Sequence, residues 1–129
     1  EAKVKYISLE PFLDFIGGLW AEDWLKSGAI NWVIIGACTG TKYGLLELCQ
    51  GWNINREVNT KDLTLVPYGK RWTLLPKIEW VREIIEAADR AKVPVFLKYN
   101  LVGLLPVEEP YYKNDGSGWA IRQEFPNVD

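Results

Sequence analysis

The sequence has no histidine and no methionine, and only two cysteines, Cys38 and Cys49, among its 129 residues. Histidine is the commonest general base of enzymes, so a Ser-His-Asp or Cys-His hydrolase cannot be built from this chain alone. Two cysteines are too few for a disulfide scaffold, and their spacing matches no common zinc pattern. We therefore predict reduced thiols, a cytoplasmic protein and no metal site.

Long hydrophobic runs and an excess of one charge are also missing. There is no run of about 18 apolar residues, so the sequence predicts no membrane span. The net charge is -2, with 15 basic and 17 acidic residues interspersed. This balance argues against a surface dedicated to polyanions, although a local basic patch stays possible. The chain opens into a predicted strand with neither a signal peptide nor an initiator methionine, so we expect the later part of a longer protein.

Three short apolar runs dominate what is present, at residues 4–10, 32–36 and 93–98. The second run is nearly continuous in apolar residues, which suits a strand buried on both faces of a sheet. The best helical pattern covers residues 77–92, behind Pro76, and leads directly into the third run. Strand, crossover helix, strand is the order of a parallel α/β sheet, so the sequence predicts an α/β fold of about three parallel strands.

The segment between the second run and the helix, residues 37–76, is long for a plain connection. Within it, residues 63–66 and 71–74 flank a segment whose Pro and Gly are typical of a hairpin turn. We expect a β-hairpin excursion here, of the kind that often forms a functional lid. Residues 101–129 are expected to form a C-terminal tail, and residues 1–129 together a single domain or domain fragment.

Several segments, in this order, resemble one protein family. Residues 6–12 look like that family's strand ending in Ser-x-Glu-Pro-Leu, and residues 30–36 look like the start of its Asp-Trp-Val-Ile-Val-Gly-Gly-Glu-Ser-Gly segment. Residues 80–82 with 91–98 look like its final helix and strand, and residues 122–126 fit the way members end. The family is a set of uncharacterised phage-associated and prokaryotic proteins. They are similar to radical S-adenosylmethionine enzymes, with spore photoproduct lyase as a distant relative.

The resemblance implies a fold and a cofactor. The fold is the C-terminal half of a partial (β/α) barrel, and a full-length protein would bind S-adenosylmethionine and an iron–sulfur cluster. The cysteine motif for the cluster would lie upstream, so we expect this chain alone to hold no cofactor and to have the missing N-terminal half as its partner. Cys38 stands where the family has a glutamate.

The candidate site residues are those that end the three runs, because ligands of parallel sheets lie beyond the carboxyl ends of the strands. Gly36, Ala37, Cys38 and Thr39 are small enough for a ligand to approach the backbone. The resemblance makes them the predicted contacts of the adenosine part of S-adenosylmethionine. The alternatives are a structural turn and, for Cys38, a small packed thiol in place of a reactive one.

Glu10, Lys98 and Asn100 form the predicted polar pocket at the same edge. Glu10 either faces a ligand, as a general base or as the partner of a cation, or it accepts loop N–H groups or pairs with Lys98. Lys98 suits a carboxylate or a phosphate. Asn100, together with Tyr99, frames a pocket or caps the strand. No catalytic residue can be singled out.

Two functions of different classes follow. The first is the C-terminal half of a radical S-adenosylmethionine-like enzyme, whose strand-end loops shape the cofactor and substrate pocket. The alternative is a non-catalytic binding module for nucleic acid or for a phage or host protein. The seven tryptophans, interleaved with basic residues such as Arg56, Lys70 and Arg71, indicate this alternative. A family member that has lost its activity is a third hypothesis.

Overall fold

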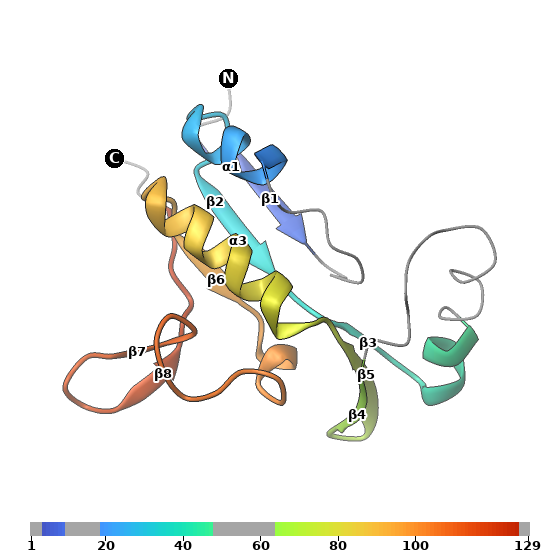
Figure 1. The fold of residues 1–129 in the computed structure, drawn as a ribbon. Helices are drawn as coiled ribbons and strands as arrows, with labels where there is room; N and C mark the ends of the chain where they lie inside the picture. The colour runs from blue at the N-terminus through green and yellow to red at the C-terminus, as the bar shows by residue number, and fades with distance from the viewer. Residues whose placement is uncertain (1–3, 10–18, 48–63, 127–129) are drawn as a thin grey trace.

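The computed structural model describes residues 4–9, 19–47 and 64–126. The three apolar runs form β1 (Tyr6–Leu9), β2 (Trp32–Ile35) and β6 (Val95–Leu97), which lie side by side in one parallel sheet in the order β1-β2-β6 (Figure 1). Their β-branched and aromatic residues favour extended backbone. The prediction of three parallel strands is confirmed.

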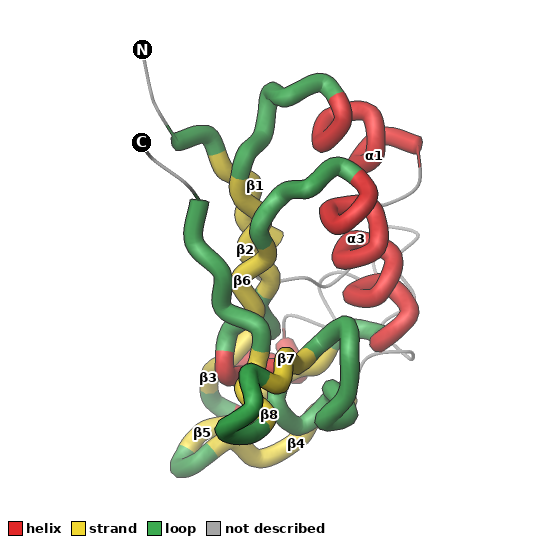
Figure 2. The backbone as a smooth tube through the Cα atoms, turned by 90° about the vertical axis from the view of Figure 1, so that its left-hand side faces the viewer, coloured by secondary structure: helices red, strands yellow, loops and turns green. Residues whose placement is uncertain are grey.

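Two helices, α1 (Leu19–Lys26) and α3 (Ile78–Arg90), cover one face of this sheet (Figure 2). The helical spacing of the apolar residues in α3 places them toward the sheet, where they meet the side chains of alternate strand residues. These core side chains are all at most 2% exposed: Val33, Ile35, Val81, Ile84, Ile85, Ala88, Val95 and Leu97. The core therefore lies between the two helices and one face of the parallel sheet.

A second, antiparallel sheet has the order β3-β5-β4. Its hairpin consists of β4 (Thr64–Tyr68) and β5 (Arg71–Leu75), and Gly69 in the turn has a φ of 61°, which favours glycine. The predicted hairpin is confirmed. The third strand, β3 (Cys38–Gly40), follows β2 with only Gly36 and Ala37 between them, so one extended stretch of chain serves both sheets (Figure 1).

The C-terminal part contains a short 3-10 helix, η2 (Tyr99–Leu101), and a small sheet of β7 (Tyr112–Asn114) and β8 (Trp119–Ile121). The chain then runs antiparallel along β6, where Phe96 pairs with Gln123. The N–H of Leu97 donates to the carbonyl of Arg122, and the N–H of Glu124 donates to that of Val95, both at 2.9 Å. The expected tail thus covers the β6 edge of the sheet.

The predicted half of a (β/α) barrel is wrong. The described residues form one parallel sheet of three strands and two antiparallel sheets, in no barrel-like arrangement. A barrel repeats the strand–helix crossover, which keeps every strand parallel. Here the chain leaves β2 straight into an antiparallel sheet and returns antiparallel after β6. The fold is mixed α/β with small sheets. No helix in the described ranges is long and apolar enough to cross a membrane.

Candidate functional site

The structure brings Asn100 together with the predicted cofactor segment at the carboxyl ends of β2 and β6. The N–H of Ala37 donates to Oδ1 of Asn100 at 3.0 Å, and Nδ2 of Asn100 donates to the carbonyl of Ala37 at 2.9 Å. The N–H of Gly36 donates to the carbonyl of Leu9 at 3.1 Å. Gly36 and Ala37 are buried, so these bonds satisfy groups that water does not reach.

The second half of that segment is a strand and not a turn. Cys38 pairs with Leu74, and Thr39 with Thr73, in the antiparallel sheet. The buried hydroxyl of Thr73 donates to the carbonyl of Cys38 at 3.1 Å. Cys38 is half-buried and Thr39 is exposed. The segment is a junction between two sheets, and its contact with the adenosine of S-adenosylmethionine stays a prediction.

Of the other predicted site residues, the structure describes Lys98 but not Glu10. Lys98 is half-buried directly after β6, and its N–H donates to the carbonyl of Ile35 at 2.9 Å. Glu10, its predicted partner, and Cys49 lie outside the described residues. Within the described ranges, no group of three or more His, Cys, Asp or Glu residues is arranged to hold a metal ion.

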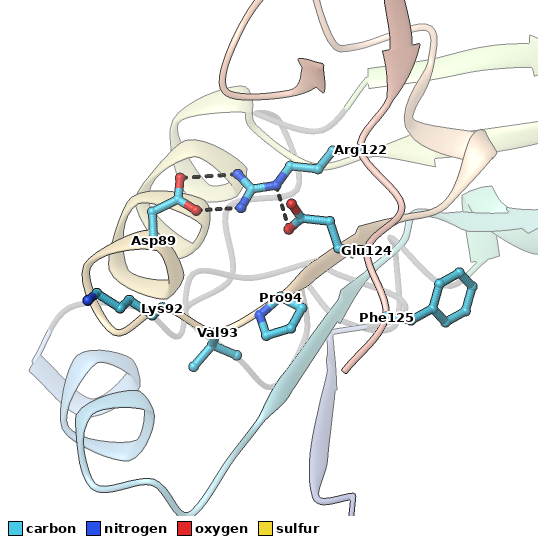
Figure 3. A pocket seen from close by; sticks show the side chains of 7 residues that line it. All are labelled: Asp89, Lys92, Val93, Pro94, Arg122, Glu124 and Phe125. Atoms are coloured by element: carbon cyan, nitrogen blue, oxygen red, sulfur yellow. Dashed lines mark hydrogen bonds and ion pairs between the residues drawn. The ribbon is translucent and has the colours of Figure 1, made fainter. Parts of the chain in front are cut away.

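Two cavities lie at the opposite end of the sheet, near the amino ends of β2 and β6. One of about 330 Å³ is lined by Asp89, Lys92, Val93, Pro94, Arg122, Glu124 and Phe125 (Figure 3). Another of about 380 Å³ shares Lys92, Val93 and Pro94 with it. Neither cavity is at the edge where the sequence predicts the site.

Three residues that line the first cavity, Arg122, Asp89 and Glu124, form an ion cluster (Figure 3). The guanidinium, in a side chain only 4% exposed, binds both carboxylate oxygens of Asp89, and its Nε donates to Oε1 of Glu124 at 2.9 Å. The same Oε1 accepts the N–H of Val95 at 3.0 Å. Burial lowers the pKa of Arg122, but the hydrogen bonds that it donates to Asp89 and Glu124 outweigh this effect, and the pKa is raised above its ordinary value. The cluster joins α3, β6 and the C-terminal segment, and most guanidinium donors are already used.

An aromatic face, which the sequence interpretation missed, lies on the side of the parallel sheet away from the helices. We define it by Tyr6, Trp32, Phe96 and Phe125, one from each strand and one from the C-terminal segment. The ring of Trp32 lies 6.0 Å from Tyr6, 6.1 Å from Phe96 and 5.8 Å from Phe125, between centroids. Tyr6 is 58% exposed and Phe125 is 69% exposed. No described helix covers this face (Figure 2).

The sequence indicates the aromatic face through the alternation of residues along the second apolar run. Trp32 and Ile34 alternate with the buried Val33 and Ile35, so the second run has one face of each kind. Because every residue of that run is apolar, its composition alone predicts a strand buried on both faces. The aromatic rings, in phase on neighbouring strands, mark the face that helices leave open.

No protein-family model, curated protein or solved structure matches this chain. The resemblance to the radical S-adenosylmethionine-like family therefore rests on the quoted motifs alone and stays a prediction. The function has to be inferred from the chain's own geometry.

Proposed function

We propose that this chain is a non-catalytic binding module whose aromatic face receives the apolar side of a helix from a partner protein. The supporting observation is a parallel sheet with helices on one face and four contacting aromatic rings on the other. Sheets of parallel strands occur almost only with both faces covered, usually by helices. Exposed apolar patches commonly mark interaction sites.

A protein partner suits this face better than a nucleic acid. Phosphate contacts from Lys and Arg supply most of the affinity for nucleic acid, and the net charge of this chain is -2. Two polar side chains beside the rings already donate hydrogen bonds to backbone carbonyls. Nε1 of Trp32 donates to the carbonyl of Glu124 at 2.8 Å, and Nε2 of Gln123 donates to that of Leu97 at 3.0 Å. The face therefore offers apolar contact more than hydrogen bonds.

The proposal is tested by site-specific crosslinking in the native cells. A p-benzoylphenylalanine at position 125, on the aromatic face, should capture a discrete polypeptide. The same group at Glu83, exposed on α3 away from the sheet, should not. The captured protein is then purified, and its binding to Tyr6→Ser and Phe125→Ser chains is measured by calorimetry, with Glu83→Ser as the control. We expect each aromatic change to weaken binding by about tenfold. Equal capture at both positions, or unchanged affinity, contradicts the proposal.

The nucleic-acid form of the binding module has its own test. Filter binding of single-stranded and double-stranded oligonucleotides at two salt concentrations should show no affinity. Salt-dependent binding that Phe125→Ser abolishes would replace the protein partner with a nucleic acid at this face.

The resemblance supports a second proposal, for a longer protein. There, with the missing N-terminal half as partner, S-adenosylmethionine and an iron–sulfur cluster would be bound. The meeting of Asn100 with Ala37 and Thr39 at one strand-end edge is the observation in its favour. Anaerobic reconstitution of the full-length protein tests it, and the absence of both cluster absorbance and S-adenosylmethionine binding contradicts it. The cytoplasmic location likewise stays a prediction.

A further inference from the structure

The outer edge of β1 carries backbone groups that no described strand pairs. The N–H of Asn31 donates to the carbonyl of Lys5 at 2.8 Å, and the N–H of Gly36 donates to the carbonyl of Leu9 at 3.1 Å. The carbonyls of Lys5 and Leu9 therefore face β2. Backbone direction alternates along a strand, so the groups of Tyr6 and Ser8 face outward. The strand order places β1 at the end of its sheet. The opposite end, at β6, is covered by the C-terminal segment.

Between Tyr6 and Leu9 this edge lacks three of the features by which proteins protect edge strands; the strand itself is four residues long, and the exposed Lys5 precedes it. Proline, bulges and charged side chains prevent pairing with another chain. The strand reads Tyr-Ile-Ser-Leu and pairs in unbroken register with β2, without a bulge, proline or charge. Both outward residues, Tyr6 and Ser8, have exposed side chains. The edge is therefore accessible and complementary to an extended polypeptide backbone.

We propose that β1 pairs with β1 of a second copy of this chain, antiparallel about a two-fold axis through Ile7. In this register Tyr6 lies opposite Ser8 of the partner subunit, and the symmetry repeats the pair. Both residues face outward, so each pair exchanges both of its N–H···O=C bonds, as in any antiparallel hydrogen-bonded pair. Two three-stranded sheets then become one continuous sheet. Such an interface is isologous and closes at a dimer.

The side chains fit this register on both faces. On the aromatic face, the large Tyr6 ring lies opposite a small serine, which leaves room for it. On the helix side, Ile7 lies opposite Ile7 of the partner subunit, at the close spacing of a non-hydrogen-bonded pair. Ile7 is half-buried and lines a small apolar cavity with Trp24 and Leu25, so the second isoleucine extends an apolar surface that already exists.

The two-fold axis has a consequence for the aromatic faces. Pairing at the edge places the two copies' faces on the same side of the joined sheet. The dimer therefore presents a doubled aromatic surface with its axis at the centre. The inference concerns the edge and goes beyond the proposed function, because it holds whatever the aromatic face binds.

Sedimentation velocity of the whole chain over a wide concentration range tests the proposal. We expect a monomer–dimer equilibrium for the wild type. In Ser8→Pro we expect a dimer dissociation constant at least about tenfold higher. Proline removes the N–H of residue 8, which points outward, and removes no N–H that is bonded to β2. Ser8→Ala keeps that N–H and should dimerise like the wild type. Far-UV circular dichroism checks the fold. If Ser8→Pro does not fold, Ser8→Lys replaces it and should weaken the dimer through charge at the edge. A monomer at every concentration, or a dimer that resists both Ser8→Pro and Ser8→Lys, overturns the proposal.

Discussion

At the scale of single residues, Asn100 is the side chain that joins the two halves of the strand-end junction. Its amide bonds to the N–H and the carbonyl of Ala37 and to Oγ1 of Thr39. It takes the place of a strand neighbour, since Ala37 lies between β2 and β3, where none of the described strands pairs with it. Sequence reasoning placed Asn100 at this edge, but it did not predict that the amide would bind backbone.

Replacing Asn100 with alanine should destabilise the protein by about 2–3 kcal/mol, because the buried N–H and carbonyl of Ala37 lose their partners. Urea unfolding measures the change. Tyr99→Ala, at a neighbouring side chain that is 61% exposed, is the matched control and should stay within about 0.5 kcal/mol of wild type. An Asn100→Ala protein as stable as the control would mean that water replaces the amide.

Asp115 gives a pH-dependent prediction. The hydroxyl and then the N–H of Ser117 donate to its carboxylate and hold the pKa of Asp115 below its ordinary value of 3.8. A lowered pKa in the folded state stabilises the β7–β8 loop above pH 3.8, and this contribution is lost as the pH falls through the folded pKa. Ser117→Ala should raise the pKa of Asp115 toward 3.8 in an NMR titration. An unchanged titration would show that the hydroxyl contributes nothing.

At the scale of elements, Arg122 ties the C-terminal segment to α3 and β6. Replacing one member of a fully buried ion cluster costs about 3–5 kcal/mol. Because Asp89 and Glu124 are 43% and 39% exposed, water screens them, and we expect Arg122→Leu to cost about 2–3 kcal/mol. Thermal unfolding checks this, with Arg71→Leu at the exposed start of β5 as the control. Equal losses for the two variants would contradict a structural role for the cluster.

The elements that sequence reasoning found are those with strong local signals. β1, β2, β6 and α3 follow from apolar periodicity, and the β4–β5 hairpin follows from Pro67 and Gly69. It missed β3 because this strand is only three residues long and ends in glycine, which is depleted in strands, and because its partner β5 lies far along the chain. It also missed the return of residues 122–124 along β6. Their sequence, Arg-Gln-Glu, is polar, and the partners that order it lie about 30 residues earlier in the chain.

At the scale of the whole molecule, the resemblance led to the wrong architecture because matching motifs describe single strands and not how they pair. The three parallel strands fit a barrel and an open sheet equally well. The two architectures are distinguished by residues 38–40 and by Gln123, which pair antiparallel and end the run of parallel strands. The position of the strand-end junction was predictable, whereas the aromatic face depended on which side the helices cover.

Ending the chain after Arg122 should destabilise the whole molecule by about 3 kcal/mol. The change removes the hydrogen bond from the N–H of Glu124 to the carbonyl of Val95. It also removes the carbonyl of Glu124, which accepts the hydrogen bond from Nε1 of Trp32, and the ring of Phe125, which packs on Trp32. It also uncovers β6, so we expect aggregation on heating. Calorimetry and light scattering follow both effects. A chain ending after Pro126 keeps these contacts and is the control, and equal behaviour of the two chains would contradict the prediction.

The direct passage of β2 into β3 has a mechanical consequence. The backbone of β2 continues into β3, and Asn100 binds it at Ala37, between the two sheets. Movement of the hairpin relative to the parallel sheet on this side therefore requires the parallel sheet to twist. A force applied to the hairpin would be carried along β2 into the centre of the core. The other strand of the hairpin, β5, leads into α3 with only Pro76 and Lys77 between them, so the same force would also reach that helix.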